Sequence, residues 1–254
     1  MSLNDDLVHV AKRLRLSGVL ESLDLRAREA VDDQLSHREF LVRLLGDEIE
    51  RREAKQLQLR LRRACFDQVR ALEDFDFRYN PRVPKAQIID LATCQFVERH
   101  ENVFIVGPTG VGKSHVAQAI GQRACRIGLR VLYLTADQLF GQLRASRADD
   151  SYERRLARFT SDSDLLILDD LGLRPLRNEE PLDLYELVRR RYERGSLIVT
   201  SNRSIQEWYP LFGDELLASA AMDRLLHHAH VITMEGASFR AQNRDRRSPK
   251  VEAG

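Results

Sequence analysis

The sequence predicts an α/β fold, in which a parallel sheet is flanked by helices and preceded by a small all-helical N-terminal domain. From about residue 86 onward, short apolar runs rich in Val, Ile and Leu alternate with helical patterns. Such alternation favours a parallel sheet that is covered on both faces. Before residue 75, leucines recur at helical spacing, glycine is scarce and proline is absent, as expected for long helices.

These patterns divide the chain into four parts. We expect a helical domain over residues 1–75, a linker over 76–85, an α/β domain over 86–240 and a disordered basic tail over 241–254. The linker prediction rests on the aromatic and proline-bearing stretch from Phe75 to Pro84. The tail prediction rests on its polar, basic composition.

Within the α/β part, each expected strand is a short apolar run. The strand candidates are Asn102–Val106, Arg130–Thr135, Leu165–Asp169, Ser196–Thr200 and Val231–Met234. The segment Gln87–His100 is predicted to be a helix, and a further helix is predicted from His115 to near Gly128. Capping boxes predict three helix starts, at Ser36 with Glu39, Thr135 with Gln138, and Ser204 with Glu207.

Composition limits the classes of protein to consider. The chain has 254 residues and a net charge of +1, from 40 basic and 39 acidic side chains. This balance neither requires nor excludes nucleic acid, because binding needs only a local basic patch. The three cysteines fit free thiols better than a disulfide framework or a zinc site. No apolar run approaches the roughly 20 residues that span a membrane, and no apolar signal segment begins the chain, so we expect a cytoplasmic protein without a membrane partner.

The most informative motif is a P-loop between a predicted strand and a predicted helix. It reads Gly107-Pro108-Thr109-Gly110-Val111-Gly112-Lys113-Ser114, followed by His115. Glycines permit positive φ and a close backbone approach, so successive amides can surround phosphate oxygens. Lys113 is expected to reach the β- and γ-phosphates, and the Ser114 hydroxyl to ligate Mg²⁺. The motif therefore predicts an ATP site at the positive end of the following helix.

Two carboxylates supply the predicted second half of this site. Asp169 and Asp170 follow an apolar strand, and ligands bind at the carboxyl ends of strands in open α/β sheets. Asp169 is the expected Mg²⁺ ligand, acting through water. Asp170 is then placed to act as general base on the attacking water.

Four segments together resemble a known family. They read GPTGVGKSH, LLILDDLG, RRRYERGSLIVTSN and AMDRLLHHAHVITMEGASFR. They resemble the IstB family, the ATPase helpers of IS21-type insertion sequences, which belong to the AAA+ class and are related to the helicase loader DnaC. The resemblance covers roughly residues 10 to 240 and implies that the domain over 86–240 is a P-loop AAA+ ATPase domain.

The resemblance implies roles for three further residues. Asn202, after a predicted strand, would contact the γ-phosphate and the attacking water, although Asn also favours simple turns. Arg224 resembles an arginine finger that reaches ATP on a neighbouring subunit; the alternative is a surface ion pair. Arg240 resembles a terminal motif that senses nucleotide within its own chain. The active form would then be a homo-oligomer with ATP at its subunit interfaces.

By the same resemblance, the chain would assemble with ATP on double-stranded target DNA and deform it. It would recruit or stimulate an IstA-type transposase, and ATP hydrolysis would reset the assembly. The DNA contacts would be mostly independent of sequence. Asp170 departs from the Glu that many AAA+ proteins carry, and its shorter side chain predicts slow hydrolysis.

Three alternatives remain open from the sequence. A helicase loader of the DnaC type would prefer single-stranded DNA. A P-loop kinase would need an acceptor pocket and no Arg224 in trans. A nucleotide switch would bind ATP without useful turnover, so that loss of the Asp170 carboxylate would change nothing.

Other polar clusters have simpler interpretations beside functional ones. Basic residues over Arg51–Arg63, and at Arg174 and Arg177, are candidate DNA contacts or solvated side chains. The run Arg189–Arg194 is expected to form ion pairs in part, and otherwise to meet phosphates or a neighbouring subunit. His227, His228 and His230 are expected to pack or lie at the surface rather than to bind a metal.

Overall fold

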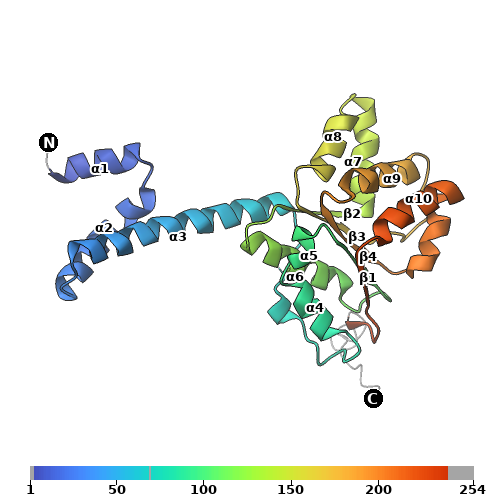
Figure 1. Cartoon of the computed structure of the whole chain (residues 1–254), viewed down its shortest axis with the longest axis horizontal. Helices are drawn as coiled ribbons and strands as arrows, with labels where there is room; N and C mark the ends of the chain where they lie inside the picture. Colours follow the sequence, from blue (N-terminus) through green and yellow to red (C-terminus); the bar gives the residue numbers. More distant parts are fainter. Residues whose placement is uncertain (1–2, 69, 240–254) are drawn as a thin grey trace, which may run out of the picture. The chain divides into compact units, whose positions relative to one another are not determined.

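A computed structural model gives the structure of the chain and describes residues 3–68 and 70–239 (Figure 1). The predicted tail over 241–254 and the candidate Arg240 lie outside the described residues. Two compact units divide the chain, residues 1–59 and residues 60–254. No helix in the described ranges is both long and apolar enough to cross a membrane.

The first unit is helical. It holds α1 (Leu3–Arg13), α2 (Ser17–Asp32) and most of α3 (His37–Ala64), whose last turn belongs to the second unit. The buried Glu48 carboxylate of α3 accepts backbone N–H groups of Gly18 and Val19 at the start of α2. Arg26 donates to both oxygens of Asp47, at 2.8 and 2.7 Å. A cap and a bidentate ion pair therefore join α2 to α3.

The second unit is a parallel five-stranded sheet with flanking helices (Figure 1). Its strands are β1 (Asn102–Val106), β2 (Val131–Thr135), β3 (Leu165–Asp169), β4 (Ser196–Ser201) and β5 (Ala229–Thr233). They lie in the order β2-β3-β4-β1-β5, and every neighbouring pair is parallel. The helical elements are η1 (Leu72–Asp74), α4 (Lys85–Leu91), α5 (Gln95–Glu98), α6 (Lys113–Arg126), α7 (Ala136–Ala148), α8 (Tyr152–Thr160), α9 (Glu180–Arg191), η2 (Ile205–Phe212) and α10 (Glu215–Leu226).

Successive strand residues face opposite layers, because side chains alternate across a sheet. Phe104, Leu166 and Val199 belong to one apolar core that also takes in residues of α7, α8, α9, η2 and α10. The neighbouring residues in each strand face the other layer, where α6 packs against β1, β2, β3 and β4. Ile167 on that face meets Gly121 of α6. Both faces are thus covered, which explains why the central strands are continuous apolar runs.

The predicted fold class is confirmed, with small differences in the element bounds. Two expected strands match in full, Asn102–Val106 and Leu165–Asp169. Two others differ by one residue at one end, and the last runs over Ala229–Thr233 instead of Val231–Met234. All three capping boxes are present. The prediction of one helix over Gln87–His100 is wrong: α4 ends at Leu91 and α5 begins at Gln95, because Cys94 takes a left-handed conformation with φ of 63°. Helix α6 begins two residues before the predicted start.

Candidate nucleotide site

The P-loop leaves the carboxyl end of β1 and leads directly into α6. Its three glycines have positive φ, 146° at Gly107, 88° at Gly110 and 100° at Gly112. A Cβ atom on Gly107 would lie 2.1 Å from the Met234 carbonyl oxygen. Residues with side chains would therefore be strained here and would also clash. The three glycines of the motif therefore allow the loop to adopt this conformation.

Lys113, the first residue of α6, is held inside the loop. It is 5% exposed, and its ammonium donates to the carbonyls of Gly107 at 2.8 Å and Pro108 at 2.9 Å. It also donates to Asn202 Oδ1 at 2.6 Å. This last bond joins the P-loop to the end of β4, two elements that are far apart in sequence. Lys113 and Asn202, both predicted to contact the γ-phosphate, are thus brought together.

The carboxylate of Asp169 is positioned by two hydroxyl groups. It is 3% exposed at the end of β3. Tyr133 of β2 donates to Oδ2 at 2.7 Å, and Thr200 of β4 donates to Oδ1. Burial, followed by the nearby charge of Asp169, holds the pKa of Tyr133 well above its usual range, so the phenol keeps its proton.

Asp170 lies one residue beyond the strand, in a left-handed conformation with φ of 58°. Its backbone N–H donates to Thr200 Oγ1 at 2.9 Å. The Thr200 hydroxyl therefore accepts from Asp170 and donates to Asp169, which fixes the two acidic residues relative to each other. Asp170 is half-buried, whereas Asp169 is enclosed.

The residues at this edge fit a magnesium–phosphate group. Ser114 follows Lys113 at the start of α6, and the enclosed carboxylate of Asp169 is at the same carboxyl edge of the sheet. Hard oxygen donors of this kind suit Mg²⁺, which keeps waters and needs only one or two protein ligands besides phosphate oxygens. No group of three or more His, Cys, Asp or Glu side chains within residues 3–68 and 70–239 is arranged to hold a metal by itself.

His115 is turned toward the segment before α4. Its Nε2 lies 3.1 Å from the Ala71 carbonyl oxygen, and its ring packs edge-on against Phe75, with centroids 5.3 Å apart. Phe75 also covers Gly112, where a Cβ would lie 2.6 Å from its ring. Phe75, directly before the predicted linker, therefore packs on the P-loop.

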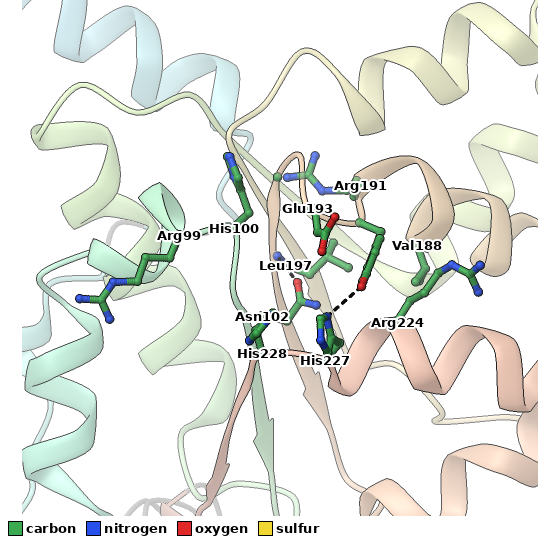
Figure 2. A pocket seen from close by; sticks show the side chains of 12 residues that line it. Arg99, His100, Asn102, Val188, Arg191, Glu193, Leu197, Arg224, His227 and His228 are labelled. Atoms are coloured by element: carbon green, nitrogen blue, oxygen red, sulfur yellow. Dashed lines mark hydrogen bonds between the residues drawn. The ribbon is translucent and has the colours of Figure 1, made fainter.

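Arg224 lies at the opposite edge of the sheet from the P-loop. It is near the end of α10, where the Leu225 carbonyl accepts the side-chain amide of Asn102, the first residue of β1, at 3.0 Å. Arg224 lines a cavity of about 170 Å³ together with Asn102 and His227 (Figure 2). Its guanidinium donates to the Ala220 carbonyl at 2.7 Å and lies 5.7 Å from the Tyr185 ring centroid. No ion pair holds it within the described part of the chain.

Comparison with known proteins identifies the family. The family model described as IstB-like ATP binding protein matches residues 9–247. The chain belongs to this family. The resemblance inferred from the motifs is therefore confirmed, and ATP binding is the property that the family description carries.

Two relatives are similar over nearly the whole chain. An ATP-binding protein of an insertion sequence from Mycobacterium tuberculosis is 40% identical over 250 residues, covering 98% of this chain and 99% of the relative. The ATP-binding protein of insertion sequence IS21 from Pseudomonas aeruginosa is 36% identical over 239 residues, covering 94% and 90%.

Solved structures share the fold at lower identity. The structure of DnaI superposes with a TM-score of 0.56 at 22% identity, over 65% of the IstB-like chain and 91% of DnaI. The replication initiator DnaA, bound to AMPPCP and single-stranded DNA, superposes with a TM-score of 0.55 at 22% identity, over 68% of this chain and 52% of DnaA. The IstB-like chain therefore spans about half of that DnaA chain, and the likeness establishes the P-loop AAA+ fold.

Sequence reasoning missed two residues of the site, Tyr133 and Thr200. Tyr133 lies within an apolar strand, where an aromatic residue normally signals core packing. For Thr200 the sequence pattern predicts only the end of a strand. Their positions next to Asp169 depend on the strand order, in which β3 lies between β2 and β4. The alternation of side chains would have placed both on one face with Asp169 once that order was known.

The basic and histidine clusters have mainly structural contacts. Arg189 and Arg190 pair with Glu186, as expected for part of that run. The prediction that the other arginines of this run meet phosphates or a neighbouring subunit is wrong for Arg191, which is 1% exposed. Arg174 pairs with Asp137 and Glu180. Two of the histidines make polar contacts at the surface. The Tyr192 hydroxyl lies 2.8 Å from His227 Nδ1, and His230 Nε2 lies 2.7 Å from Glu101 Oε2.

Proposed function

We propose that this IstB-like protein is a slow, magnesium-dependent ATPase that assembles on duplex DNA as a homo-oligomer, deforms it and recruits or stimulates a transposase. The observation that carries the proposal is the division of candidate residues between two edges of one sheet. Lys113, Asn202 and Asp169 lie at the carboxyl edge, and Arg224 lies at the amino edge. Five-residue β1 separates these edges by about 16 Å, which is beyond the reach of an arginine side chain.

Each residue would then have a defined task. Lys113 and the P-loop amides would bind the phosphates, and Ser114 with Asp169 would hold Mg²⁺. Asp170 would accept a proton from the attacking water, and Asn202 would orient that water beside the γ-phosphate. Bound Mg²⁺ would supply positive charge to the phosphate oxygens. Arg224 would complete the site of a neighbouring subunit, where it stabilises developing charge.

The proposed binding of DNA and recruitment of a transposase are supported by the family and by its insertion-sequence relatives. Exposed arginines near the end of α3, such as Arg62 and Arg63, are candidates for contacts with phosphates. Such contacts carry no sequence code, which suits DNA binding that is mostly independent of sequence.

Assembly tests the proposal directly. Sizing chromatography with light scattering, with and without ATP·Mg²⁺, is run on the protein with a duplex or a single strand of equal length. We expect a large complex only with both ATP and duplex. Assembly on single strands alone would favour a helicase loader, and a monomer under every condition would contradict the proposal.

Subunit mixing tests the shared site. Neither Arg224→Ala nor Lys113→Ala protein should hydrolyse ATP by itself. Their mixture should recover part of the activity, because an intact Lys113 site can then meet an intact Arg224. Full activity of Arg224→Ala by itself would instead favour a kinase or another monomeric P-loop enzyme.

A further inference from the structure

The hydroxyl group of Tyr133 lies between two carboxylates from distant parts of the sequence. It is 2.7 Å from Asp169 Oδ2 and 2.9 Å from Asp67 Oδ2. The Tyr133 ring is 2% exposed, whereas Asp67 is exposed to solvent. A phenol has one proton and donates to one acceptor at a time. The two hydrogen bonds are therefore alternatives, related by rotation of the hydroxyl group about the Cζ–Oη bond of Tyr133.

The segment that carries Asp67 follows the last turn of α3 and is fixed to the P-loop helix α6. The Gln68 N–H donates to Gln118 Oε1 at 3.3 Å, and the Gln122 amide donates to the Gln68 carbonyl at 3.3 Å. Phe66 packs on Gly121, where a Cβ would lie 2.9 Å from the ring. These contacts restrain the backbone on both sides of Asp67. A change in the hydrogen bonding of Asp67 therefore acts on a segment that is already held against α6.

We propose that Tyr133 is a positioning residue that links the metal carboxylate to the segment after α3. Without a cation, its proton favours Asp169; with a cation at the site, it favours Asp67. The physical reason is that Asp169 becomes a weaker acceptor when its carboxylate also faces a positive charge. The segment over residues 65–68 is then held more tightly when magnesium nucleotide is bound. This inference rests on the proposed function, because it requires Mg²⁺ beside Asp169.

Hydrogen–deuterium exchange of the full chain tests the link. The protein is compared without ligand, with AMPPCP in EDTA, and with AMPPCP and Mg²⁺. In the wild type we expect amides over residues 65–68 to exchange several-fold more slowly only when Mg²⁺ is present. Tyr133→Phe keeps the ring but removes the proton, and Asp67→Asn weakens the second acceptor at an exposed position. Both variants should lose this magnesium-dependent protection.

Tyr152→Phe is the matched control. Its hydroxyl also donates to a buried carboxylate, Asp183 Oδ1 at 2.7 Å, but these residues belong to α8 and α9, which pack on the sheet face opposite α6. This variant should keep the protection. Persistence of protection in Tyr133→Phe, or its absence in a wild type that binds AMPPCP·Mg²⁺, would overturn the inference.

A titration gives a second readout. Because the Tyr133 proton must leave Asp169 when the cation binds, the hydroxyl group opposes cation binding, and we expect Tyr133→Phe to need several-fold less Mg²⁺ for half-maximal AMPPCP binding. AMPPCP affinity in EDTA should match the wild type. An unchanged Mg²⁺ requirement would contradict the positioning role. If the wild type failed to bind AMPPCP at all, the proposed function would fail, and calorimetry of the wild type distinguishes that result from failure of the link alone.

Discussion

At the scale of single residues, the site depends on side chains whose positions are fixed by neighbours. Thr200 joins Asp169 to Asp170, and Asn202 holds Lys113. Asp170 itself is half-buried and lies beyond the strand. The two acidic residues are therefore in different environments. These environments suit the proposed roles of Asp169 in metal binding and of Asp170 in proton transfer.

Replacing Asp170 tests its role as general base. We expect Asp170→Asn to bind ATP normally and to lower turnover by about 10²–10⁴-fold, the usual contribution of a positioned base. Asp170→Glu should raise turnover, because the added methylene extends the carboxylate toward the water. Steady-state phosphate release and ATP affinity measure both effects. Unchanged turnover in Asp170→Asn would support a nucleotide switch instead.

The three cysteines should differ sharply in reactivity. Cys65 is exposed, whereas Cys94 and Cys125 are 2% and 0% exposed. Burial raises the pKa of both buried thiols to about 11, so at pH 8 they carry little reactive thiolate. With the thiol reagent DTNB we expect one rapid equivalent, absent in Cys65→Ser, and two slow ones. Three rapid equivalents in the folded wild type would contradict this burial.

At the scale of elements, one buried arginine fastens the end of α9 to the sheet. Arg191 donates to the carbonyl groups of Phe159, Asp164 and Ser196, at 3.0, 3.1 and 2.8 Å. No carboxylate pairs with it in the described structure, so backbone dipoles stabilise its charge. Burial lowers its pKa to about 10, and it remains protonated at neutral pH.

Arg191→Met should destabilise the protein strongly. The substitution keeps much of the apolar stem but leaves several buried carbonyls without donors, each costing about 1–3 kcal/mol. We expect a loss of about 3 kcal/mol or more in the free energy of unfolding, measured with urea. Arg194→Met, at an exposed position nearby, should change it by less than about 0.5 kcal/mol. Equal effects of the two substitutions would refute the structural role of Arg191.

At the scale of the whole molecule, the proposed ATPase site would be completed by a neighbouring subunit, and the proposed function also requires DNA. The candidate finger Arg224 and the P-loop lie at opposite edges of one sheet, so a ring or filament of subunits would bring them together. Net charge is +1, so DNA contacts would depend on local groups such as Arg62 and Arg63.

Salt dependence tests those contacts. The logarithm of DNA affinity should fall linearly with the logarithm of salt concentration, because bound counterions are released. Replacing both Arg62 and Arg63 by Ala should weaken binding evenly across sequences and reduce the slope by about 2. Arg189→Ala, whose arginine pairs with Glu186, is the control and should leave the slope unchanged. A slope that stays the same in the double variant would exclude this surface as a phosphate contact.

The sequence by itself determined the fold class, three helix caps, the P-loop and the pair Asp169–Asp170. These features are local: glycine conformations, capping side chains and apolar runs depend on neighbours in the chain. The break between α4 and α5 escaped prediction, because Cys94 adopts a left-handed conformation that its residue type does not signal.

Only the tertiary structure decided which distant groups meet. The strand order brings Tyr133 and Thr200 to Asp169 and joins Asn202 to Lys113. Helix α10 leads into the amino end of β5, which is parallel to β1, so Arg224 lies at the edge away from its own P-loop. A parallel sheet can be ordered in several ways without changing the pattern of any strand, so these contacts follow from packing between elements and not from sequence periodicity.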